Sequence, residues 1–358
     1  MNRYGVIMAG GGGTRFWPLS RQKRPKQVIN LTGKDLMINE TIERMARVIP
    51  RENIFIVTSA EQAPCIRDAI NGRVLPDHIL SEPTACNTAA CIGYAAVEIT
   101  SRYGDGTMLV TPADHFIRDV DALSKVFEKA LSAAEREDKL LTIGIHPDRP
   151  ATGFGYIRFD AKASSDVKPV LEFREKPDVE TAKKYVASGE YTWNSGMFAW
   201  KASTILRKFA QYAPDIYAEL AKLGEAKGAA SEQAMLEKVY SAIRKISVDY
   251  AVMEPSAAAG DVLVIPAEFG WSDVGSWDML SVLHAPDMDG NVFVGDVLAI
   301  NAKENMCYST KKLIALVDVS NLVVVETDDA IMICPGDRAQ DVKLLVDEIR
   351  RQGRTELL

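Results

Sequence analysis

The feature that most constrains the fold is a short apolar run that leads directly into four consecutive glycines. Residues 4–8 (YGVIM) are typical of a buried strand, and residues 9–13 (AGGGG) follow without a break. A glycine-rich turn at the carboxyl end of a strand lets backbone N–H groups approach phosphate oxygens, because no Cβ lies in the way. Arg15 and Lys26 supply positive charge beside that turn. The pattern predicts an α/β sheet with a phosphate-binding loop at the end of its first strand.

Two common glycine loops do not fit this segment. A dinucleotide-binding loop requires the pattern G-x-G-x-x-G, but Arg15 or Phe16 replaces its third glycine in the two registers that the sequence allows. Trp17-Pro18 also opposes an immediate long helix, because a residue before proline is pushed out of the α region. A P-loop would need Gly-Lys-Ser or Gly-Lys-Thr, which does not follow these glycines. A purely structural turn is the other alternative, and the neighbouring cations weigh against it.

Short apolar strands alternate with amphipathic helices over residues 1–145. The expected strands are residues 4–8, 54–58, 78–81, 107–111 and 140–145, and the expected helices are residues 37–48, 61–69, 88–103 and 120–137. Such alternation indicates βαβ units and therefore an α/β domain with a doubly wound, mainly parallel sheet. Ligands of these sheets bind beyond the carboxyl ends of the strands.

The character of the chain changes near residues 285–291 (APDMDGN). Short β-rich pieces separated by turn residues follow, at residues 292–294, 297–300, 306–309, 314–317, 322–326 and 331–334. We therefore expect two domains. Residues 1–285 form an α/β catalytic domain, completed by a mixed region after about residue 146, and residues 286–358 form a small all-β unit that ends in a helix.

The composition excludes several classes of function. Of the 358 residues, 47% are hydrophobic and 25% are charged, and the net charge is −7. Proteins that bind nucleic acid present basic surfaces, so we do not expect that partner. No apolar run approaches about 18 residues and no secretory pattern opens the chain, so we expect no membrane association. Five cysteines without C-x-x-C spacing indicate free thiols, and we expect a cytoplasmic protein.

Several segments together resemble the sugar-nucleotide pyrophosphorylase family. Residues 10–15 followed by Pro25-Lys26 resemble its G-G-x-G-T-R…P-K signature, and residues 16–20 (FWPLS) are similar to its mannose-1-phosphate guanylyltransferase branch. Residues 269–277 (FGWSDVGSW) give a long and specific match to another family motif. Motifs of this kind extend from residue 9 to about residue 277, and the resemblance implies a short left-handed β-helix for the C-terminal unit.

Two aspartates are candidates for holding a metal ion. Asp114 follows the expected strand at 107–111, where a carboxylate is well placed to hold Mg²⁺ against nucleotide phosphates. An aspartate that only caps a turn is at least as common. Asp273 lies in a glycine-flanked loop far away in the sequence. The resemblance implies that the two meet, because both match the family's metal positions.

Three segments are candidates for a sugar site. Glu175 and Lys176 end an expected strand, where they form either an ordinary exposed ion pair or a site for sugar hydroxyls and a sugar phosphate. Asn194 belongs to Asn-Ser-Gly, which predicts a tight turn before an apolar strand. The resemblance implies that these residues bind the sugar phosphate and that the backbone at Gly155 faces the hexose. Asp249 either caps a helix or borders this site.

The nucleotide is assigned to the glycine loop and to residues 82–89 (EPTACNTA), where Asn87 is also a candidate helix cap. The resemblance places this second segment near the base. A carboxylate at Glu82 suits guanine, because the N1–H and N2 amino edge offers only donors. The nucleotide-binding residues that we expect are Gly10, Gly11, Gly13, Thr14, Glu82 and Asn87, with Arg15 and Lys26 as catalytic cations.

The resemblance implies transfer of GMP from GTP to mannose 1-phosphate, giving GDP-mannose and pyrophosphate. Direct in-line attack needs no covalent nucleophile, and Mg²⁺ with the cations would offset the repulsion between two anions. We expect GTP and mannose 1-phosphate as partners and allow for a homodimer. Some family members carry an isomerase domain, for which we expect no room in 358 residues.

Two alternatives stay open. One is a pyrophosphorylase for another hexose 1-phosphate or another nucleotide, because pocket contacts that the sequence resolves poorly make that choice. The other is a catalytically silent sugar-nucleotide sensor or regulatory subunit. Loss of a cation or carboxylate would mark such a subunit, yet Arg15, Lys26, Asp114 and Asp273 are all present.

Overall fold

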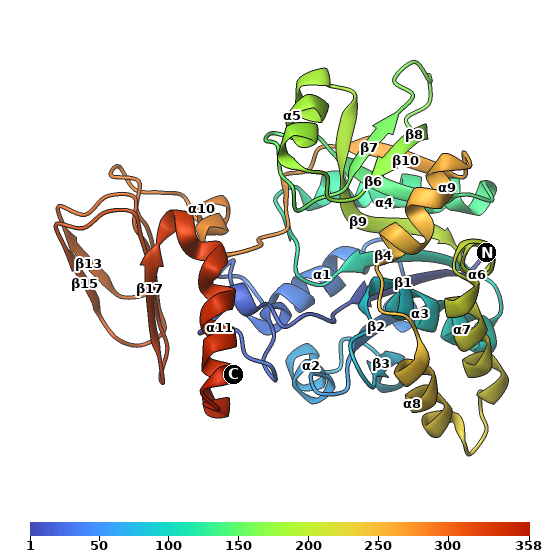
Figure 1. Cartoon of the computed structure of the whole chain (residues 1–358), viewed down its shortest axis with the longest axis horizontal. Coiled ribbons are helices and arrows are strands. Elements are labelled where there is room, and N and C mark those ends of the chain that lie inside the picture. The colour runs from blue at the N-terminus through green and yellow to red at the C-terminus, as the bar shows by residue number, and fades with distance from the viewer.

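The apolar strands expected within residues 1–145 belong to one nine-stranded sheet (Figure 1). The computed structural model describes residues 1–358. The strand order is β3 (Ile79–Glu82), β2 (Ile54–Ser59), β1 (Arg3–Met8), β4 (Thr107–Pro112), β9 (Tyr191–Lys201), β6 (Leu140–Ile145), β10 (Val262–Ala267), β8 (Lys168–Arg174) and β7 (Tyr156–Phe159). The strands predicted within residues 1–145 are all present close to their predicted bounds.

The sheet is parallel in one half and mixed in the other. β1 pairs in parallel with β2 and β4, and β2 pairs in parallel with β3. β9 runs antiparallel between β4 and β6, whereas β10 is parallel to β6 and antiparallel to β8. The second half differs from a purely parallel sheet because β7 and β8 form a hairpin, after which β9 returns beside β7 in the opposite direction.

One prediction inside β9 is wrong. The sequence predicts a tight turn at residues 194–196 ahead of a strand, but these residues lie within the eleven-residue strand β9. Gly196 has a φ of 72°, and the register between β9 and β6 shifts between Thr142 and Gly144. The segment therefore marks an irregularity in a central strand. The irregularity arises from the pairing of β9 with β6, and the sequence around residues 194–196 gives no signal of that pairing.

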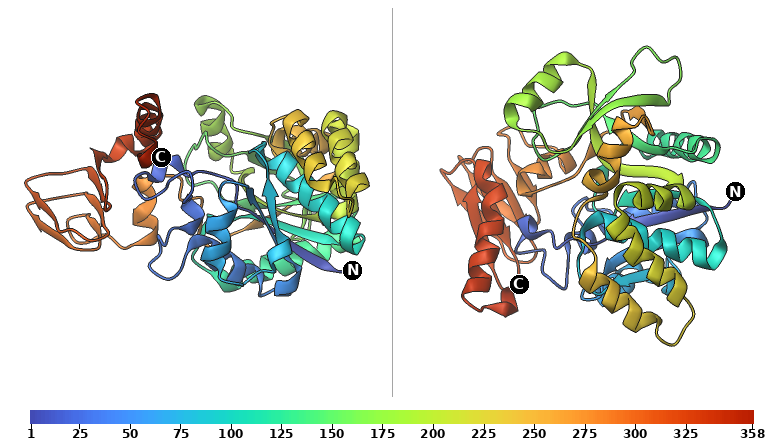
Figure 2. Two further views of the ribbon diagram at one scale, coloured as in Figure 1. Left: turned by 90° about the horizontal axis from the view of Figure 1, so that it is seen from below. Right: turned by 45° about the vertical axis from the view of Figure 1, so that its right-hand side comes forward.

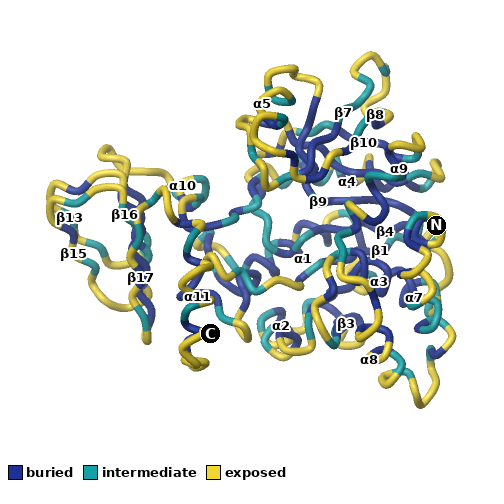
Figure 3. Tube along the Cα trace, in the orientation of Figure 1, coloured by how far each residue is buried: buried dark blue, intermediate teal, exposed yellow.

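Helices cover both faces of the sheet (Figure 2). One face carries α3 (Asn87–Tyr103), α6 (Ala202–Tyr212), α7 (Pro214–Ala226) and α8 (Glu232–Ala242). The other carries α1 (Met37–Met45), α2 (Ala63–Ile70) and α4 (Val120–Arg136). Neighbouring residues of β1 alternate between the two cores, with Val6 in the first and Ile7 in the second. The doubly wound α/β domain is confirmed, and Figure 3 shows its strands buried between the helices.

The C-terminal unit stands to one side of the α/β domain (Figure 1). Parallel pairing joins β12 (Val292–Val294), β14 (Met306–Ser309) and β16 (Leu322–Glu326), and also β13 (Val297–Ile300) and β15 (Ile314–Val317). β17 (Ile331–Pro335) is antiparallel to β16. Strands from successive turns of chain enclose a small core of Ala302, Cys307, Leu316 and Val324. This arrangement confirms the β-helix-like unit. The predicted boundary after residue 285 falls in the loop between α10 (Leu280–Leu283) and β12.

A third core joins the C-terminal unit to the glycine loop. It includes residues of β16 and of α11 (Val342–Arg351), the helix that lies between the unit and the α/β domain in Figure 1. Phe16 and Trp17, which follow the glycine loop, and Trp277, which follows Asp273, are buried in the same cluster. Trp277 Nε1 donates to the carbonyl oxygen of Trp17 at 3.0 Å. The C-terminal unit thus supports two loops of the cleft described below.

The helices are too short or too polar to span a lipid bilayer. None of them combines the length and the apolar character that crossing a membrane requires.

Candidate active site

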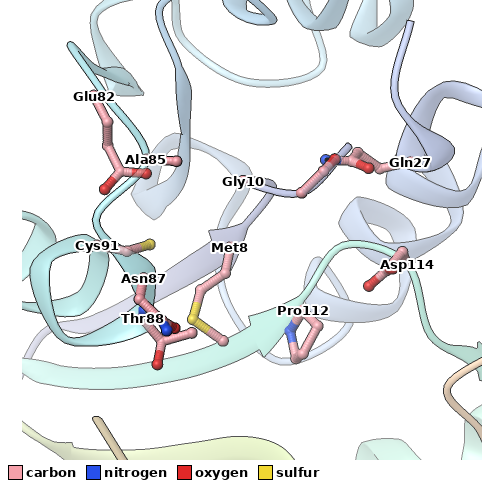
Figure 4. Close-up of a pocket in the computed structure, with 11 residues that line it drawn as sticks. Met8, Gly10, Gln27, Glu82, Ala85, Asn87, Thr88, Cys91, Pro112 and Asp114 are labelled. Carbon is pink, nitrogen blue, oxygen red and sulfur yellow. Dashed lines mark hydrogen bonds between the residues drawn. The ribbon is translucent and has the colours of Figure 1, made fainter. Parts of the chain in front are cut away.

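Three adjoining cavities lie around the carboxyl ends of β1 and β4, and each is named here after one residue. The Glu82 cavity, of about 230 Å³, is drawn in Figure 4 and is lined by residues that include Met8, Gly10, Gly11, Gln27, Asn87 and Asp114. The Asp273 cavity, of about 260 Å³, is lined by Gly13, Thr14, Arg15, Phe16, Lys26, Asp114, His115, Asp273 and Gly275. The Glu175 cavity, of about 240 Å³, is lined by residues that include Gly155, Lys176, Asn194, Asp249 and Asp273. Shared wall residues make the three cavities one cleft.

In the glycine loop, backbone geometry requires glycine at one position. Gly13 has a φ of 59°, and a Cβ there would lie 2.5 Å from the Cβ of Lys26. Gly10 and Gly11 meet no such contact, and both line the Glu82 cavity. Gln27 Nε2 donates to two backbone oxygens around the loop, at 2.7 and 3.2 Å. Gln27 was given no role from the sequence, although it stands directly after Lys26 in the family signature.

Glu82 is buried at the end of β3, with one hydrogen-bond partner for its carboxylate. Tyr240 Oη, from α8, donates to Glu82 Oε1 at 3.1 Å. Burial raises the pKa of Glu82 to about 7, and the hydrogen bond from Tyr240 acts in the opposite direction. Figure 4 shows Glu82 on the opposite side of Met8 from Asp114. No sequence signal connects Tyr240 with Glu82, because 158 residues separate them.

Asn87 is the first residue of α3 and not its cap. Cys86 occupies the N-cap position, and no side chain caps the helix, so the alternative role of Asn87 as a helix cap is not found. Asn87 has a φ of 70°, in a region that asparagine tolerates better than most residues. Its Oδ1 accepts a hydrogen bond from the backbone N–H of Thr88 at 2.8 Å. The side chain lines the Glu82 cavity, as the sequence predicts for a nucleotide-binding residue.

Lys26 holds together the two loops that carry Asp114 and Asp273. Its buried ammonium donates to Asp114 Oδ2 at 3.0 Å, to Asp114 O at 3.0 Å and to Asp273 O at 2.8 Å. All three of its N–H donors are therefore used within the protein. Short antiparallel pairing of β5 (Phe116–Ile117) with β11 (Trp271–Ser272) brings the same two loops side by side.

The pKa values of Asp114 and Asp273 are shifted in opposite directions, and the charge of Lys26 contributes to the difference. Burial acts to raise the pKa of Asp114, but the charge of Lys26, together with its hydrogen bond, outweighs burial and keeps that pKa below its usual value. Burial raises the pKa of Asp273, where the charge of Lys26 lowers it only in part. The negative charge of Asp114 adds to the increase at Asp273. The two carboxyl groups therefore sense each other electrostatically across the Asp273 cavity.

This pair fits a magnesium ion by the chemistry of its donors. Mg²⁺ is held in enzymes by one or two carboxylates, with phosphate oxygens and waters in the other positions. No group of three or more His, Cys, Asp or Glu side chains gathers as a metal site. An ion held by Asp114 and Asp273 would therefore take its other ligands from substrate phosphates and water. The assignment of these aspartates to Mg²⁺ stays a prediction.

Arg15 is exposed at the Asp273 cavity and contacts the C-terminal unit. Its Nη1 donates to Gln340 Oε1 at 2.8 Å, and Gln340 Nε2 donates to Ser276 Oγ at 2.5 Å. Gln340 belongs to η7 (Gly336–Asp341), so the C-terminal unit bridges the glycine loop and the loop after Asp273. Gln340 was given no role from the sequence, because a contact across 325 residues leaves no local signal.

The Glu175 cavity gathers two carboxyl groups near Asn194. Asn194 Nδ2 donates to Asp249 Oδ1 at 2.9 Å, and Thr142 Oγ1 donates to Asn194 Oδ1 at 2.8 Å. A Cβ at Gly155 would lie 2.4 Å from Glu175 Oε2, so glycine is needed beside that carboxylate. Burial and the charge of Asp249 raise the pKa of Glu175 to about 7. The cavity thus holds a carboxyl group, that of Glu175, whose pKa is raised to about 7, next to a fixed amide.

Asp249 lines this cavity, which is one of the two roles that the sequence left open. It is the first residue of the π-helical turn η5 (Asp249–Met253), and burial raises its pKa. Glu175 Oε2 is buried and has no hydrogen-bond partner in the protein. Buried polar atoms are nearly always paired, so this unsatisfied acceptor beside the cavity is an exception.

Two residues with an unfavourable backbone conformation lie directly beside acidic residues of the cleft. Lys176, whose ammonium lies 3.2 Å from Glu175 Oε1, has a φ of 45°. Val274, directly after Asp273, has a φ of 43°, which is unfavourable for a β-branched residue. Each such residue costs about 1–3 kcal/mol and persists only where the surroundings fix it. The burial of Val274 in the core shared with the C-terminal unit fixes it here.

The structure brings all the site residues predicted from the sequence into this one cleft. Each of them lines at least one of the three cavities. Their roles toward substrates stay predictions. The residues that sequence reasoning left without a role are Gln27, Tyr240 and Gln340, and each acts by fixing a predicted residue or loop.

Comparisons with known proteins agree with this architecture. The family described as Nucleotidyl transferase matches residues 4–289, and the family described as MannoseP isomerase/GMP-like beta-helix domain matches residues 295–349. Mannose-1-phosphate guanylyltransferase of Escherichia coli K12 is 40% identical over 99% of this chain and 74% of its own length. A xanthan biosynthesis protein of Xanthomonas campestris is 41% identical over 98% of this chain and 74% of its own.

Solved structures show the same fold over nearly the whole chain. A Thermus thermophilus protein, described as a mannose-1-phosphate geranyltransferase, is 32% identical, with a TM-score of 0.88 over 98% of this chain and 100% of its own. A Helicobacter pylori protein described as a mannose-6-phosphate isomerase is 24% identical, with a TM-score of 0.62 over 76% of this chain and 100% of its own. The second likeness concerns the fold alone.

Proposed function

This chain belongs to the nucleotidyl transferase family, and we propose that it transfers GMP from GTP to mannose 1-phosphate, giving GDP-mannose and pyrophosphate. It is a nucleotidyltransferase enzyme by its relatives, two of which are named mannose-1-phosphate guanylyltransferase and are 40% and 38% identical to it. The observation that carries the choice of base is the buried carboxylate of Glu82 in the wall of the cavity beside the glycine loop.

Guanine suits the Glu82 cavity because of its pattern of donors. Its N1–H and N2 amino group lie on one edge, and a carboxylate can accept from both. Tyr240 donates to only one oxygen of Glu82, so acceptor capacity is left for a ligand. The cavity contains no lysine, arginine or histidine, as suits an uncharged base. The backbone of Gly10 and Gly11 lines the same cavity, where phosphates would follow the base.

Mannose 1-phosphate suits the Glu175 cavity. Hexose hydroxyls are both donors and acceptors, and Glu175, Asp249 and Asn194 supply acceptors and an amide N–H around one space. The Oε2 of Glu175 is an acceptor that no protein group satisfies, in a residue that lines this space. Lys176 is about half exposed, and its ammonium can exchange its contact with Glu175 for the phosphate of the sugar.

The chemistry requires two anions to approach each other. An oxygen of the sugar phosphate forms a bond to the α-phosphorus of GTP while the bond to pyrophosphate breaks, in line with the attack. Arg15 lines the Asp273 cavity and Lys176 lines the Glu175 cavity, and both have donors available to phosphate oxygens. Lys26 acts through its charge and by holding the Asp114 and Asp273 loops, since its donors are occupied. Mg²⁺ bound by the two aspartates would supply further positive charge to the phosphates.

The test is a screen of pyrophosphate release from each pairing of GTP, ATP, UTP and dTTP with mannose 1-phosphate and glucose 1-phosphate, with Mg²⁺ present. GTP with mannose 1-phosphate should give the highest kcat/KM. A clearly higher value for UTP or dTTP with glucose 1-phosphate would contradict the substrate assignment and leave only the reaction class. The absence of turnover with every pair would favour the sensor alternative.

A further inference from the structure

His115 lies where two of the cavities meet. It follows Asp114 on the loop after β4, and His115 and Asp273 are the two residues that line both the Asp273 cavity and the Glu175 cavity. Arg15 and the two aspartates predicted to hold Mg²⁺ against the nucleotide phosphates line the first of these cavities, and the sugar phosphate is assigned to the second. The phosphorus that undergoes substitution would therefore lie at the boundary that His115 occupies.

Two contacts fix the ring of His115 and the position of its proton. Trp271 Nε1 lies 3.1 Å from His115 Nδ1, and the two ring planes are nearly perpendicular, at 89°. An indole N–H can only donate, so Nδ1 accepts and carries no hydrogen. The neutral ring then carries its hydrogen on Nε2. The buried Arg44 donates from Nη2 to the carbonyl oxygen of His115 at 3.0 Å, which holds the backbone in place.

The second ring nitrogen of His115 is left available. Nε2 makes no hydrogen bond to a protein atom, yet it is not among the buried polar atoms that lack a partner. It is therefore accessible, and the space beside it is the cleft that the residue lines. A fixed N–H at the place where charge shifts between phosphate oxygens is the type of group that stabilises a phosphoryl-transfer transition state.

We propose that His115 is a catalytic residue whose Nε2–H donates a hydrogen bond to a non-bridging oxygen of the transferred phosphate. This inference rests on the proposed function, because it needs the reacting phosphate at the boundary of the two cavities. In the step, an oxygen of the sugar phosphate bonds to the α-phosphorus, and the electron pair of the breaking bond leaves with pyrophosphate. His115 keeps its proton throughout. Because Nε2 carries that proton, this atom does not ligate a metal ion.

The experiment compares His115→Leu with His115→Gln, since a glutamine amide can place an N–H near the position of Nε2. His115→Leu should lower kcat by about 100-fold, the usual effect of removing one preorganised donor. The KM of each substrate should change by less than about threefold, because the contact forms chiefly in the transition state. His115→Gln should recover about tenfold of the loss. The control is His146→Leu, which changes an exposed histidine outside the three cavities and should leave kcat unchanged.

A second variant leaves His115 in place. Trp271→Phe removes the donor that fixes the ring and should lower kcat by about tenfold, so the proposal stays testable if His115→Leu does not fold. Calorimetric titration of each substrate, without turnover, should give wild-type affinities for His115→Leu and His115→Gln.

Three results would overturn the proposal: wild-type kcat in His115→Leu, a His115→Gln enzyme as slow as His115→Leu, or a loss that excess Mg²⁺ restores. Each variant is compared with wild type on whichever substrate pair the wild type uses best. An error in the choice of GTP or mannose 1-phosphate would therefore appear in the wild-type screen and would leave this comparison intact.

Discussion

The Glu82 cavity and the Glu175 cavity each contain a buried glutamate whose pKa is raised to about 7, but the neighbours differ. At Glu82, burial raises the pKa, and the neutral hydroxyl of Tyr240 donates to the carboxylate. At Glu175, burial is joined by the negative charge of Asp249, and Lys176 acts against both. A lone carboxylate without a cation suits a base with N–H donors, whereas paired carboxyl groups beside a lysine suit hydroxyls and a phosphate. In the proposed assignment, the neighbours of each glutamate, and not its burial, decide which ligand it would bind.

The largest expected effect belongs to Asp273, which lines both the Asp273 cavity and the Glu175 cavity. Asp273→Ala should lower kcat by about three orders of magnitude, because it removes the carboxylate at the boundary that is predicted to hold Mg²⁺. The melting temperature should change little, since burial disfavours this charged group in the folded protein. Glu268→Ala, which changes an exposed carboxylate before the same loop, is the control. Near-normal Mg²⁺-dependent turnover in Asp273→Ala would contradict the predicted role of Asp273 in holding Mg²⁺.

A smaller effect is expected at Lys26, which donates hydrogen bonds to both Asp114 and Asp273 and so links their loops. Lys26→Met keeps the aliphatic stem and removes the ammonium, so kcat should fall by about 100-fold. The melting temperature should also fall, because Asp114 loses its ion-pair partner. Steady-state kinetics and thermal melting measure the two effects separately. A variant with lower stability but normal kcat would show that Lys26 supports the fold alone.

Two glycines offer a matched test of the sugar half. Gly155→Ala would place a Cβ 2.4 Å from Glu175 Oε2, whereas a Cβ at Gly153 meets nothing within 4 Å. Gly155→Ala should therefore raise the KM for mannose 1-phosphate by about tenfold and spare the KM for GTP. Gly153→Ala should leave both values close to wild type. Equal effects of the two substitutions would show that local flexibility, and not the position of Glu175, decides sugar binding.

The last expected effect is a gain of stability in the nucleotide half that depends on pH. The pKa of Glu82 rises from 4.5 to about 7 on folding, so its contribution to stability is present below pH 4.5 and lost as the pH rises through 7. Glu82→Gln has no charge to bury, so it avoids this loss in the free energy of unfolding, which amounts to at most about 3 kcal/mol. The melting temperature of Glu82→Gln should exceed that of wild type by several degrees at pH 8 and by almost nothing near pH 4.5. Glu61→Gln, at an exposed glutamate, should show no such difference. A gain that is the same at both pH values would have another cause.

The sequence predicts the parallel half of the sheet and the strands of the C-terminal unit, because apolar periodicity and turn residues are local signals. It does not predict the strand position of Asn194, since pairing with β6 causes the irregularity there. The site residues next to glycines or in motifs, such as Gly13 and Asp273, could be named from the sequence. Tyr240 and Gln340 could not, because each acts on a residue more than 150 positions away.

The central claim is that the Glu82 cavity holds the nucleotide and the Glu175 cavity holds the sugar phosphate. The most direct test is the KM of each substrate, varied in turn, for Glu82→Gln and for Lys176→Met. Glu82→Gln should raise the KM for GTP by about tenfold and spare mannose 1-phosphate, because the amide replaces one acceptor oxygen with a donor that opposes guanine. Lys176→Met should raise the KM for mannose 1-phosphate by about tenfold and spare GTP. The reverse pattern, or equal effects on both substrates in both variants, would contradict the assignment of the two cavities.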